Sequence, residues 1–133
     1  MKITENFTLE ELTVTSKPIP NVPNEQQIAN LTALATHVLQ PLRDMLGKPI
    51  KVNSAFRSVE VNKAVGGVPT SQHCSGEAAD LDVADNAQLF QLIRNNFTFD
   101  QLIWEGGNDI QPAWVHVSYR EGNNRKQVLP VGK

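Results

Sequence analysis

The sequence predicts an α+β fold, with helices in the first half of the chain and strands in the second half. Apolar residues recur at three- and four-residue spacing over residues 24–46, which is typical of a helix with one buried face. Shorter apolar runs follow from residue 50, and turns rich in Gly, Asn and Asp join the later ones. Because these links are short, we expect a small antiparallel sheet with the N-terminal helices packed on it.

Residues 1–23 are expected to form a short helix and an arm. Thr8 and Glu11 have the spacing of a helix capping box, and Phe7 and Leu12 occupy the flanking apolar positions. Residues 13–23 contain three prolines and no sustained period, so they predict an irregular segment that lies over the domain.

The long helix should begin after Asn24, a good N-cap residue, and end at Gly47. Pro41 lies inside the apolar pattern. Because proline removes a backbone donor and clashes with the preceding turn, it should kink or interrupt the helix near its last turns.

Alternation and turn residues predict the remaining elements. Ser58 is placed to cap a brief helix that ends at Gly66 and Gly67, and Asp85 or Asn86 opens another helix. Strands are expected at residues 50–54, 78–83, 101–105, 114–119 and 127–131.

Composition places the chain among ordinary globular proteins and excludes several classes of partner. With 133 residues, 40% apolar and 20% charged, residues 1–133 are expected to be a single domain with its own core. The net charge is −2 and no Lys/Arg cluster forms a basic patch, so we expect no nucleic-acid partner. The single cysteine, Cys74, excludes an intramolecular disulfide.

No apolar run approaches the roughly 18 residues of a membrane span, so no membrane partner is expected. The first six residues lack the apolar region of a signal peptide. We therefore expect a protein made in the cytoplasm, which reaches any substrate outside the cell after release or by another route. We also expect a monomer.

Two histidines and an aspartate form the candidate metal site. His73 lies in a polar loop, Asp80 in the strand predicted at 78–83 and His116 in the strand predicted at 114–119. This donor set is one that zinc takes when three protein ligands leave a fourth position for water, as in a hydrolytic site. Considered alone, each histidine is more often a structural residue.

Several short motifs surround these three residues in a fixed order. They are residues 7–12, 21–23, 39–43 and 54–58, Asn62, Gly66, Gly67, residues 71–73, Gly76, Ala78, Asp80, Trp114 and His116. Together they resemble the zinc D-Ala-D-Ala carboxypeptidase family and related murein peptidases, and the opening of the chain resembles the phage-type members. The likeness covers roughly positions 6 to 120.

The resemblance implies a hedgehog/D-Ala-D-Ala peptidase-like domain with one Zn2+ per chain, held by His73, Asp80 and His116. It implies a metallopeptidase that cleaves D-amino-acid-containing bonds in peptidoglycan stem peptides, as a carboxypeptidase or an endopeptidase. Arg57 is expected to hold a substrate carboxylate, since a planar guanidinium binds one through two parallel bonds. Its alternative is an ion pair with Glu60.

Ser71, from the same family motif, and Trp114, an aromatic residue suited to line a groove, are the other expected substrate contacts.

The general base departs from the commoner family pattern. Many relatives carry a Glu three residues before the last His, whereas this chain has Ala113 there. Glu105 ends a neighbouring predicted strand and is the best remaining proton acceptor, with Glu77 and Asp82 as alternatives.

Two other functions remain open at this point. Ala113 favours a non-catalytic peptidoglycan-binding or phage structural module that keeps the metal-site fold. A cysteine-dependent amidase would rest on Cys74 alone, and adjacent Cys and His side chains usually point apart.

Overall fold

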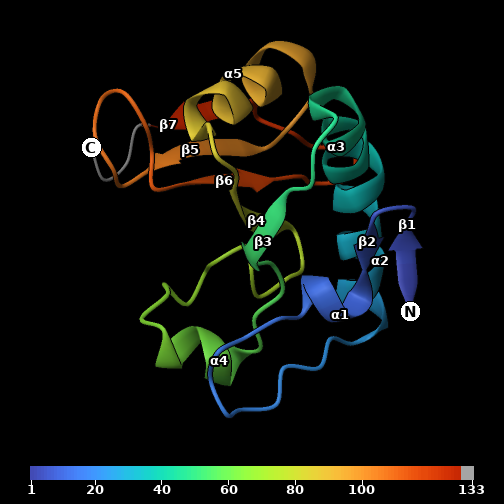
Figure 1. The fold of residues 1–133 in the computed structure, drawn as a ribbon. Helices are drawn as coiled ribbons and strands as arrows, with labels where there is room; N and C mark the ends of the chain where they lie inside the picture. The colour runs from blue at the N-terminus through green and yellow to red at the C-terminus, as the bar shows by residue number, and fades with distance from the viewer. Residues whose placement is uncertain (130–133) are drawn as a thin grey trace.

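Helices pack against one face of a five-stranded sheet in the computed structural model, which describes residues 1–129 (Figure 1). The strand order is β3-β4-β6-β5-β7. The strands are β3 (Lys51–Ser54), β4 (Ala78–Asp82), β5 (Gln101–Glu105), β6 (Trp114–Ser118) and β7 (Gln127–Leu129). The predicted strands are thus confirmed within one residue at their starts, while residues 130 and 131 of the last one lie outside the described part.

The expectation of a purely antiparallel sheet is wrong at one edge. β3, β4, β6 and β5 pair antiparallel in turn, but β7 pairs parallel with β5. The position of β4 explains this, because it already occupies the free edge of β6. The chain therefore turns back after β6 and adds β7 outside β5, and two strands that both oppose β6 run parallel to each other.

The N-terminal segment contains a hairpin that the sequence did not predict. β1 (Lys2–Thr4) pairs with β2 (Phe7–Thr8), and α1 (Leu9–Leu12) follows directly. The predicted cap is confirmed, because the Thr8 hydroxyl accepts a hydrogen bond from the Glu11 backbone N–H at 3.1 Å. Residues 13–23 contain no helix or strand, as expected for the arm.

The long helix is continuous but changes its winding before Pro41. α2 (Glu25–Leu34) begins with a full capping box between Asn24 and Gln27, and α3 (Gln40–Leu46) ends at Gly47 with a φ of 72°. Between them η1 (Ala35–Leu39) is a π-helix. A wider turn leaves room for the proline ring where an α-helical carbonyl would clash, so the predicted interruption takes this form.

Two further helices complete the fold. α4 (Val59–Ala64) is capped by Ser58, and α5 (Asn86–Asn96) is capped by Asp85, both as predicted. α5 contacts β5 and β6, so a helix from the middle of the chain covers the sheet together with the N-terminal helices. That is a correction to the expected arrangement.

The sheet alternates between a core face and an open face. Val115 and Val117 of β6 are fully buried with Leu81 and Leu102 from the neighbouring strands. The residues between them, such as His116, point to the opposite face. This alternation leaves one face of the sheet available for a site.

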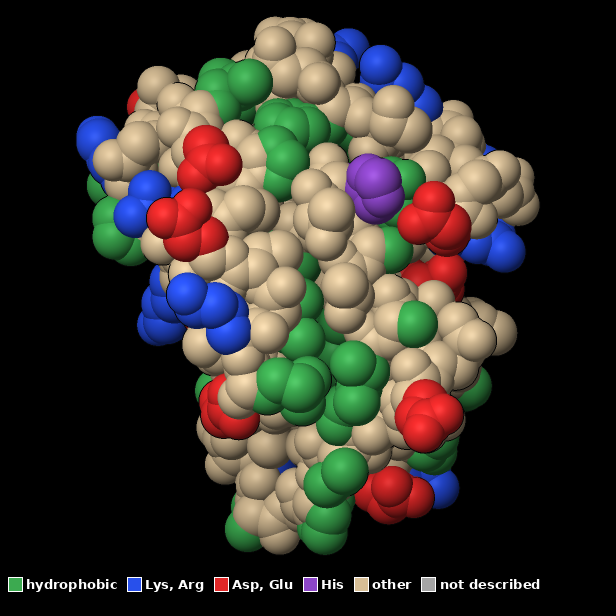
Figure 2. All heavy atoms as spheres, turned by 90° about the vertical axis from the view of Figure 1, so that its right-hand side faces the viewer, with side chains coloured by type: hydrophobic (Ala, Val, Ile, Leu, Met, Phe, Trp, Pro, Cys, Tyr) green, Lys and Arg blue, Asp and Glu red, His purple; other side chains and the backbone are tan. Residues whose placement is uncertain are grey.

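Acidic and basic side chains are interspersed on the face turned toward the viewer in Figure 2, and apolar side chains form a band between them. No large basic patch lies on this face, in keeping with the charge pattern of the sequence. In residues 1–129 no helix is both long enough and apolar enough to cross a membrane.

Candidate active site

Strand register brings two of the predicted ligands together. Asp80 of β4 lies directly opposite His116 of β6, and Ile103 of β5 lies opposite His116 on its other side. Residues directly opposite in a sheet share a face, so both side chains project from the open face. This places a carboxylate and an imidazole side by side although 36 residues separate them along the chain.

His73 completes the group from a loop. The candidate ligand atoms of His73, Asp80 and His116 all lie within 4.8 Å of one another. His73 Nε2 is 3.3 Å from one Asp80 carboxylate oxygen, and His116 Nδ1 is 3.0 Å from the other. The three residues predicted from the sequence therefore converge on one point.

The ring of His73 is oriented by a backbone contact. Its Nδ1 lies 2.6 Å from the carbonyl oxygen of Ala55. Because a carbonyl can only accept, Nδ1 carries the proton and Nε2 presents a lone pair toward Asp80 and His116. Metal-binding histidines are commonly fixed in this way.

Asp80 is held as a carboxylate. Burial alone would raise its pKa, but hydrogen bonds and charge interactions with His116 and His73 outweigh burial and hold the pKa well below its ordinary value. Two imidazoles and one ionised carboxylate, all largely buried, fit one zinc ion with a coordination position left for water.

Arg57 lies against the metal group rather than against Glu60. Its Nε contacts Ser54 Oγ at 3.1 Å, Nη1 contacts Asn62 Oδ1 at 3.1 Å, and Nη2 lies 3.4 Å from Asp80 Oδ2. The alternative pair with Glu60 is not present among the described residues. Arg57 keeps further N–H groups for a substrate carboxylate beside Asp80.

Glu105 lies one row along the open face from His116. It pairs with Trp114 across β5 and β6, two residues from the Ile103–His116 pair. Burial raises the pKa of its carboxyl, His116 and His73 lower it, and Asp80 raises it further. Glu105 thus lies near enough to all three candidate ligands for their charges to affect the pKa of its carboxyl.

The two alternative bases have other partners. Asp82 accepts a hydrogen bond from Asn86 Nδ2 at 2.8 Å. Glu77 accepts one from the Ser75 hydroxyl and lies 3.8 Å from the Arg120 guanidinium. Both alternatives therefore already hold polar partners.

A sequence model of the peptidase M15 family matches residues 5–118. This chain belongs to the peptidase M15 family. Over 95 residues it is 39% identical to the zinc D-Ala-D-Ala carboxypeptidase of Streptomyces albus G, an alignment that covers 68% of this chain and 37% of that protein. The chain thus aligns with well under half of its relative. The predicted resemblance to the zinc D-Ala-D-Ala carboxypeptidase family is confirmed, while its likeness to the phage-type members stays a prediction.

Other residues of the M15 motif hold the site residues in place. Asn62 is buried, accepts from Arg57 and donates to the Val68 carbonyl. A Cβ on Gly67 would lie 2.0 Å from Asn62 Oδ1, so only glycine fits there. Gly76 has a φ of +79°, and a Cβ there would lie 2.6 Å from the carbonyl oxygen of Gln27 on α2.

A groove of about 650 Å³ adjoins the metal group on the M15 domain and includes His116 in its wall. Of the three residues expected to contact the substrate, Ser71 lines this groove, whereas Trp114 and Arg57 do not. Arg57 instead lines a smaller cavity of about 100 Å³. The lining also contains residues that the sequence analysis did not select, namely Gln72, Gln101, Ile103, Arg120 and Arg125.

For three of these groove residues, their positions in the sequence could have indicated that they lie near the site. Gln72 is next to His73, and Gln101 and Ile103 alternate with core residues on β5. Arg120 and Arg125 come from a turn whose path depends on β7, and no local pattern places them.

Cys74 and Trp104 lie outside the metal group. Cys74 is partly buried, burial raises the pKa of its thiol, and it is not part of the metal group found among the described residues. Trp104 packs edge-on against Phe90 in the core, with ring centres 5.2 Å apart.

Proposed function

We propose that this protein is a zinc-dependent peptidase that hydrolyses a D-amino-acid-containing bond in peptidoglycan stem peptides. The convergence of His73, Asp80 and His116, with the Glu105 carboxylate in the next row, is the observation that carries the proposal. Membership of the M15 family and the name of the Streptomyces relative support the class of reaction and of substrate.

The proposed roles follow from position. His73, Asp80 and His116 hold the zinc, which when bound supplies an activated water and polarises a carbonyl oxygen. Glu105 accepts a proton from the attacking water and passes it to the leaving amine. Arg57 binds a substrate carboxylate, while Ser71 and Trp114 contact the substrate on the two sides of His116.

The choice between carboxypeptidase and endopeptidase depends on which carboxylate Arg57 binds. A terminal carboxylate would place the last peptide bond over the metal group. A side-chain carboxylate would place an internal bond there. Both remain within this proposal.

Cleavage of defined stem peptides tests the proposal. Protein loaded with one equivalent of zinc should release product from a pentapeptide ending in D-Ala-D-Ala, and mass spectrometry identifies the bond. A chelator should abolish cleavage and added zinc should restore it. Alkylation of Cys74 should have no effect, whereas inhibition by the alkylating reagent would support the cysteine-dependent alternative.

Ala113 supports a second candidate function. It occupies the position where many relatives carry a Glu, and its small side chain offers no proton acceptor. If zinc-loaded protein binds stem peptides but yields no product, the protein is a binding module rather than an enzyme.

A further inference from the structure

The groove extends from His116 on the side away from Glu105. Along β5, Gln101 and Ile103 line it while Glu105 does not. Since alternate strand residues are about 6.5–7 Å apart, the groove covers the row of His116 and Ile103 and the next row, that of Gln101. A substrate that spans the metal group therefore has one part near Arg57 and the rest in this groove.

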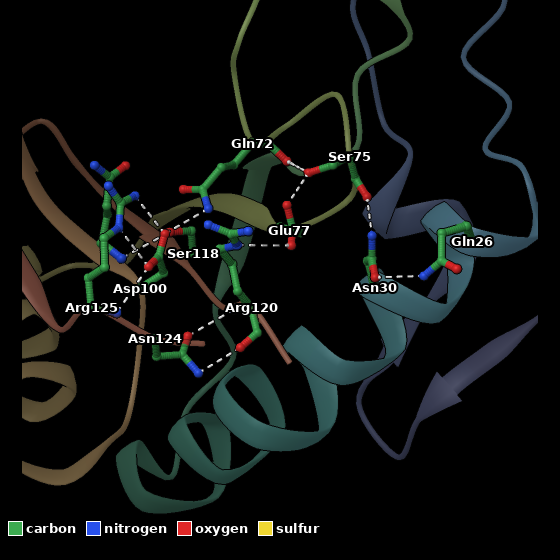
Figure 3. A network of polar contacts seen from close by, with 11 residues as sticks. Gln26, Asn30, Gln72, Ser75, Glu77, Asp100, Ser118, Arg120, Asn124 and Arg125 are labelled. Atoms are coloured by element: carbon green, nitrogen blue, oxygen red, sulfur yellow. Dashed lines mark hydrogen bonds and ion pairs between the residues drawn. The ribbon is translucent and has the colours of Figure 1, made fainter. Parts of the chain in front are cut away.

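Gln72 is fixed in the groove wall by a contact with Asp100. Its Nε2 donates to Asp100 Oδ2 at 2.8 Å, and because a carboxylate only accepts, this contact fixes the orientation of the amide (Figure 3). Its Oε1 is buried and accepts no hydrogen bond from the described residues. Because protein atoms cover Oε1, Gln72 shapes the groove wall rather than offering this acceptor to a ligand.

The groove also offers one cation and one anion that are only loosely paired. Arg120 Nε lies 3.8 Å from Glu77 Oε2, which is beyond hydrogen-bond distance, and the Arg120 side chain is 44% exposed. The backbone of Arg120 is fixed by two hydrogen bonds with the Asn124 side chain, at 2.9 and 2.8 Å. Both charged groups are thus held at the groove and can take a ligand partner.

Arg125 is less available to bind a ligand than Arg120 is. Its Nε and Nη2 donate to the two carboxylate oxygens of Asp100 at 2.9 and 2.8 Å, and Asp100 is fully buried (Figure 3). This fork is occupied and its charge is compensated locally. Glu77 Oε1 already accepts from the Ser75 hydroxyl, so Glu77 Oε2 and the Arg120 guanidinium are the charged groups of the groove that remain open to a ligand.

We propose that this groove binds the acyl side of the stem peptide and selects a residue whose side chain ends in both an ammonium and a carboxylate group. Arg120 takes the carboxylate and Glu77 takes the ammonium. A diaminopimelyl residue has this end group, whereas a lysyl residue has the ammonium alone. The inference rests on the proposed function, and a volume of about 650 Å³ suits several residues of a peptide.

Calorimetry with two tetrapeptides tests the selection without relying on turnover. The peptides are identical except that the third residue is diaminopimelyl in one and lysyl in the other. Zinc-loaded wild type should bind the diaminopimelyl peptide roughly tenfold more tightly, because one charge-assisted pair distinguishes them. Arg120→Gln should reduce the ratio of the two Kd values to near one.

Two variants provide controls for charge and position. Arg94→Gln removes an exposed arginine from α5, on the core side of the sheet, and should keep the wild-type ratio. Glu77→Gln should weaken both peptides, since both carry the ammonium group. The same ratios should appear in kcat/KM for the matching pentapeptides.

Equal Kd values for the two peptides in wild type would overturn the selection, as would a ratio that Arg120→Gln leaves unchanged. Selective binding without cleavage would support the groove and contradict the peptidase. Cleavage of both peptides at equal rates would support the peptidase and contradict the groove.

Discussion

At the scale of single residues, the site depends on which ring nitrogen each histidine presents. His73 commits Nδ1 to the Ala55 carbonyl and presents Nε2, whereas His116 faces Asp80 with Nδ1. The two rings meet edge-on with centres 5.1 Å apart. The geometry thus specifies one donor atom from each ring, and each can be removed separately.

We expect one zinc per chain in wild type and a loss of zinc affinity by orders of magnitude in His73→Ala, because water cannot replace a fixed imidazole. Cys74→Ser is the matched control from the adjacent position and should retain full zinc. Metal content after dialysis gives the measurement. Full zinc in His73→Ala, or loss of zinc in Cys74→Ser, would mean that the proposed ligand set is wrong.

Glu105→Gln should retain the fold and the zinc but lower turnover by about 10²–10⁴-fold, the usual contribution of a general base. The change is nearly isosteric, so it removes the proton acceptor and little else. Asp82→Asn is the comparison, because Asp82 lies on the same face but is already bonded to Asn86. A larger loss in Asp82→Asn than in Glu105→Gln would transfer the base role to Asp82.

Arg57→Lys should reduce kcat/KM on a stem peptide at least tenfold, because lysine keeps the charge but cannot form a two-bond fork. Thermal unfolding of the zinc-loaded variant separates this from a structural effect. A normal melting transition with poor cleavage supports substrate binding. A normal rate excludes Arg57 from the substrate contacts.

At the scale of elements, the loop from α4 to β4 carries His73 and several other motif residues and depends on close packing. Gly67→Ala should clash with Asn62 Oδ1 and displace the Arg57–Asn62 contact, with a stability loss of about 1–3 kcal/mol typical of overpacking. Gly66→Ala is the control, since a Cβ there meets nothing within 4 Å and only a φ of +77° opposes it.

Chemical denaturation and kcat/KM measured on both glycine variants test whether Asn62 positions Arg57. We expect Gly67→Ala to lose cleavage more than Gly66→Ala does. Equal cleavage in the two variants would show that Asn62 does not position Arg57.

Sequence patterns predicted elements well where local chemistry determines them. The caps at Thr8, Asn24, Ser58 and Asp85 all form as expected, because each depends on one side chain and a backbone N–H three residues away. The hairpin of β1 and β2 was missed because strands this short show no alternation. The π-helix was not specified either, since Pro41 predicts a disruption but not its form.

At the scale of the whole molecule, long-range pairing determined what the sequence could not predict. The metal residues were identified because family motifs place them in order. The parallel edge strand and the groove depend on where β7 docks, and no residue in the turn before β7 predicts which strand it will pair with. Arg120 and Arg125 could therefore be assigned only from the structure.

Asp100 links these distant segments and should make stability depend on pH. Hydrogen bonds from Arg125 outweigh burial and lower the pKa of Asp100 to about 2. A carboxyl whose pKa is lower in the folded state stabilises the fold above its unfolded pKa of about 4, and this contribution is lost as the pH falls toward 2.

Asp100→Asn should therefore lower the free energy of unfolding by about 2 kcal/mol at pH 7, and by much less near pH 2. Urea denaturation of the zinc-free proteins at both pH values measures the difference without metal binding. A difference that does not change with pH would show that the Asp100 charge contributes nothing.

The position of His73 beside Ser71 and Gln72 has a consequence for how such proteins diverge. One short loop supplies both a metal-binding residue and part of the groove wall, so changes that alter substrate preference there risk the zinc as well. The turn that carries Arg120 lines the groove but contributes no candidate metal ligand. Among relatives that act on different cell walls, we therefore expect the segment from residue 120 to 124 to vary most, while the loop around His73 stays nearly constant.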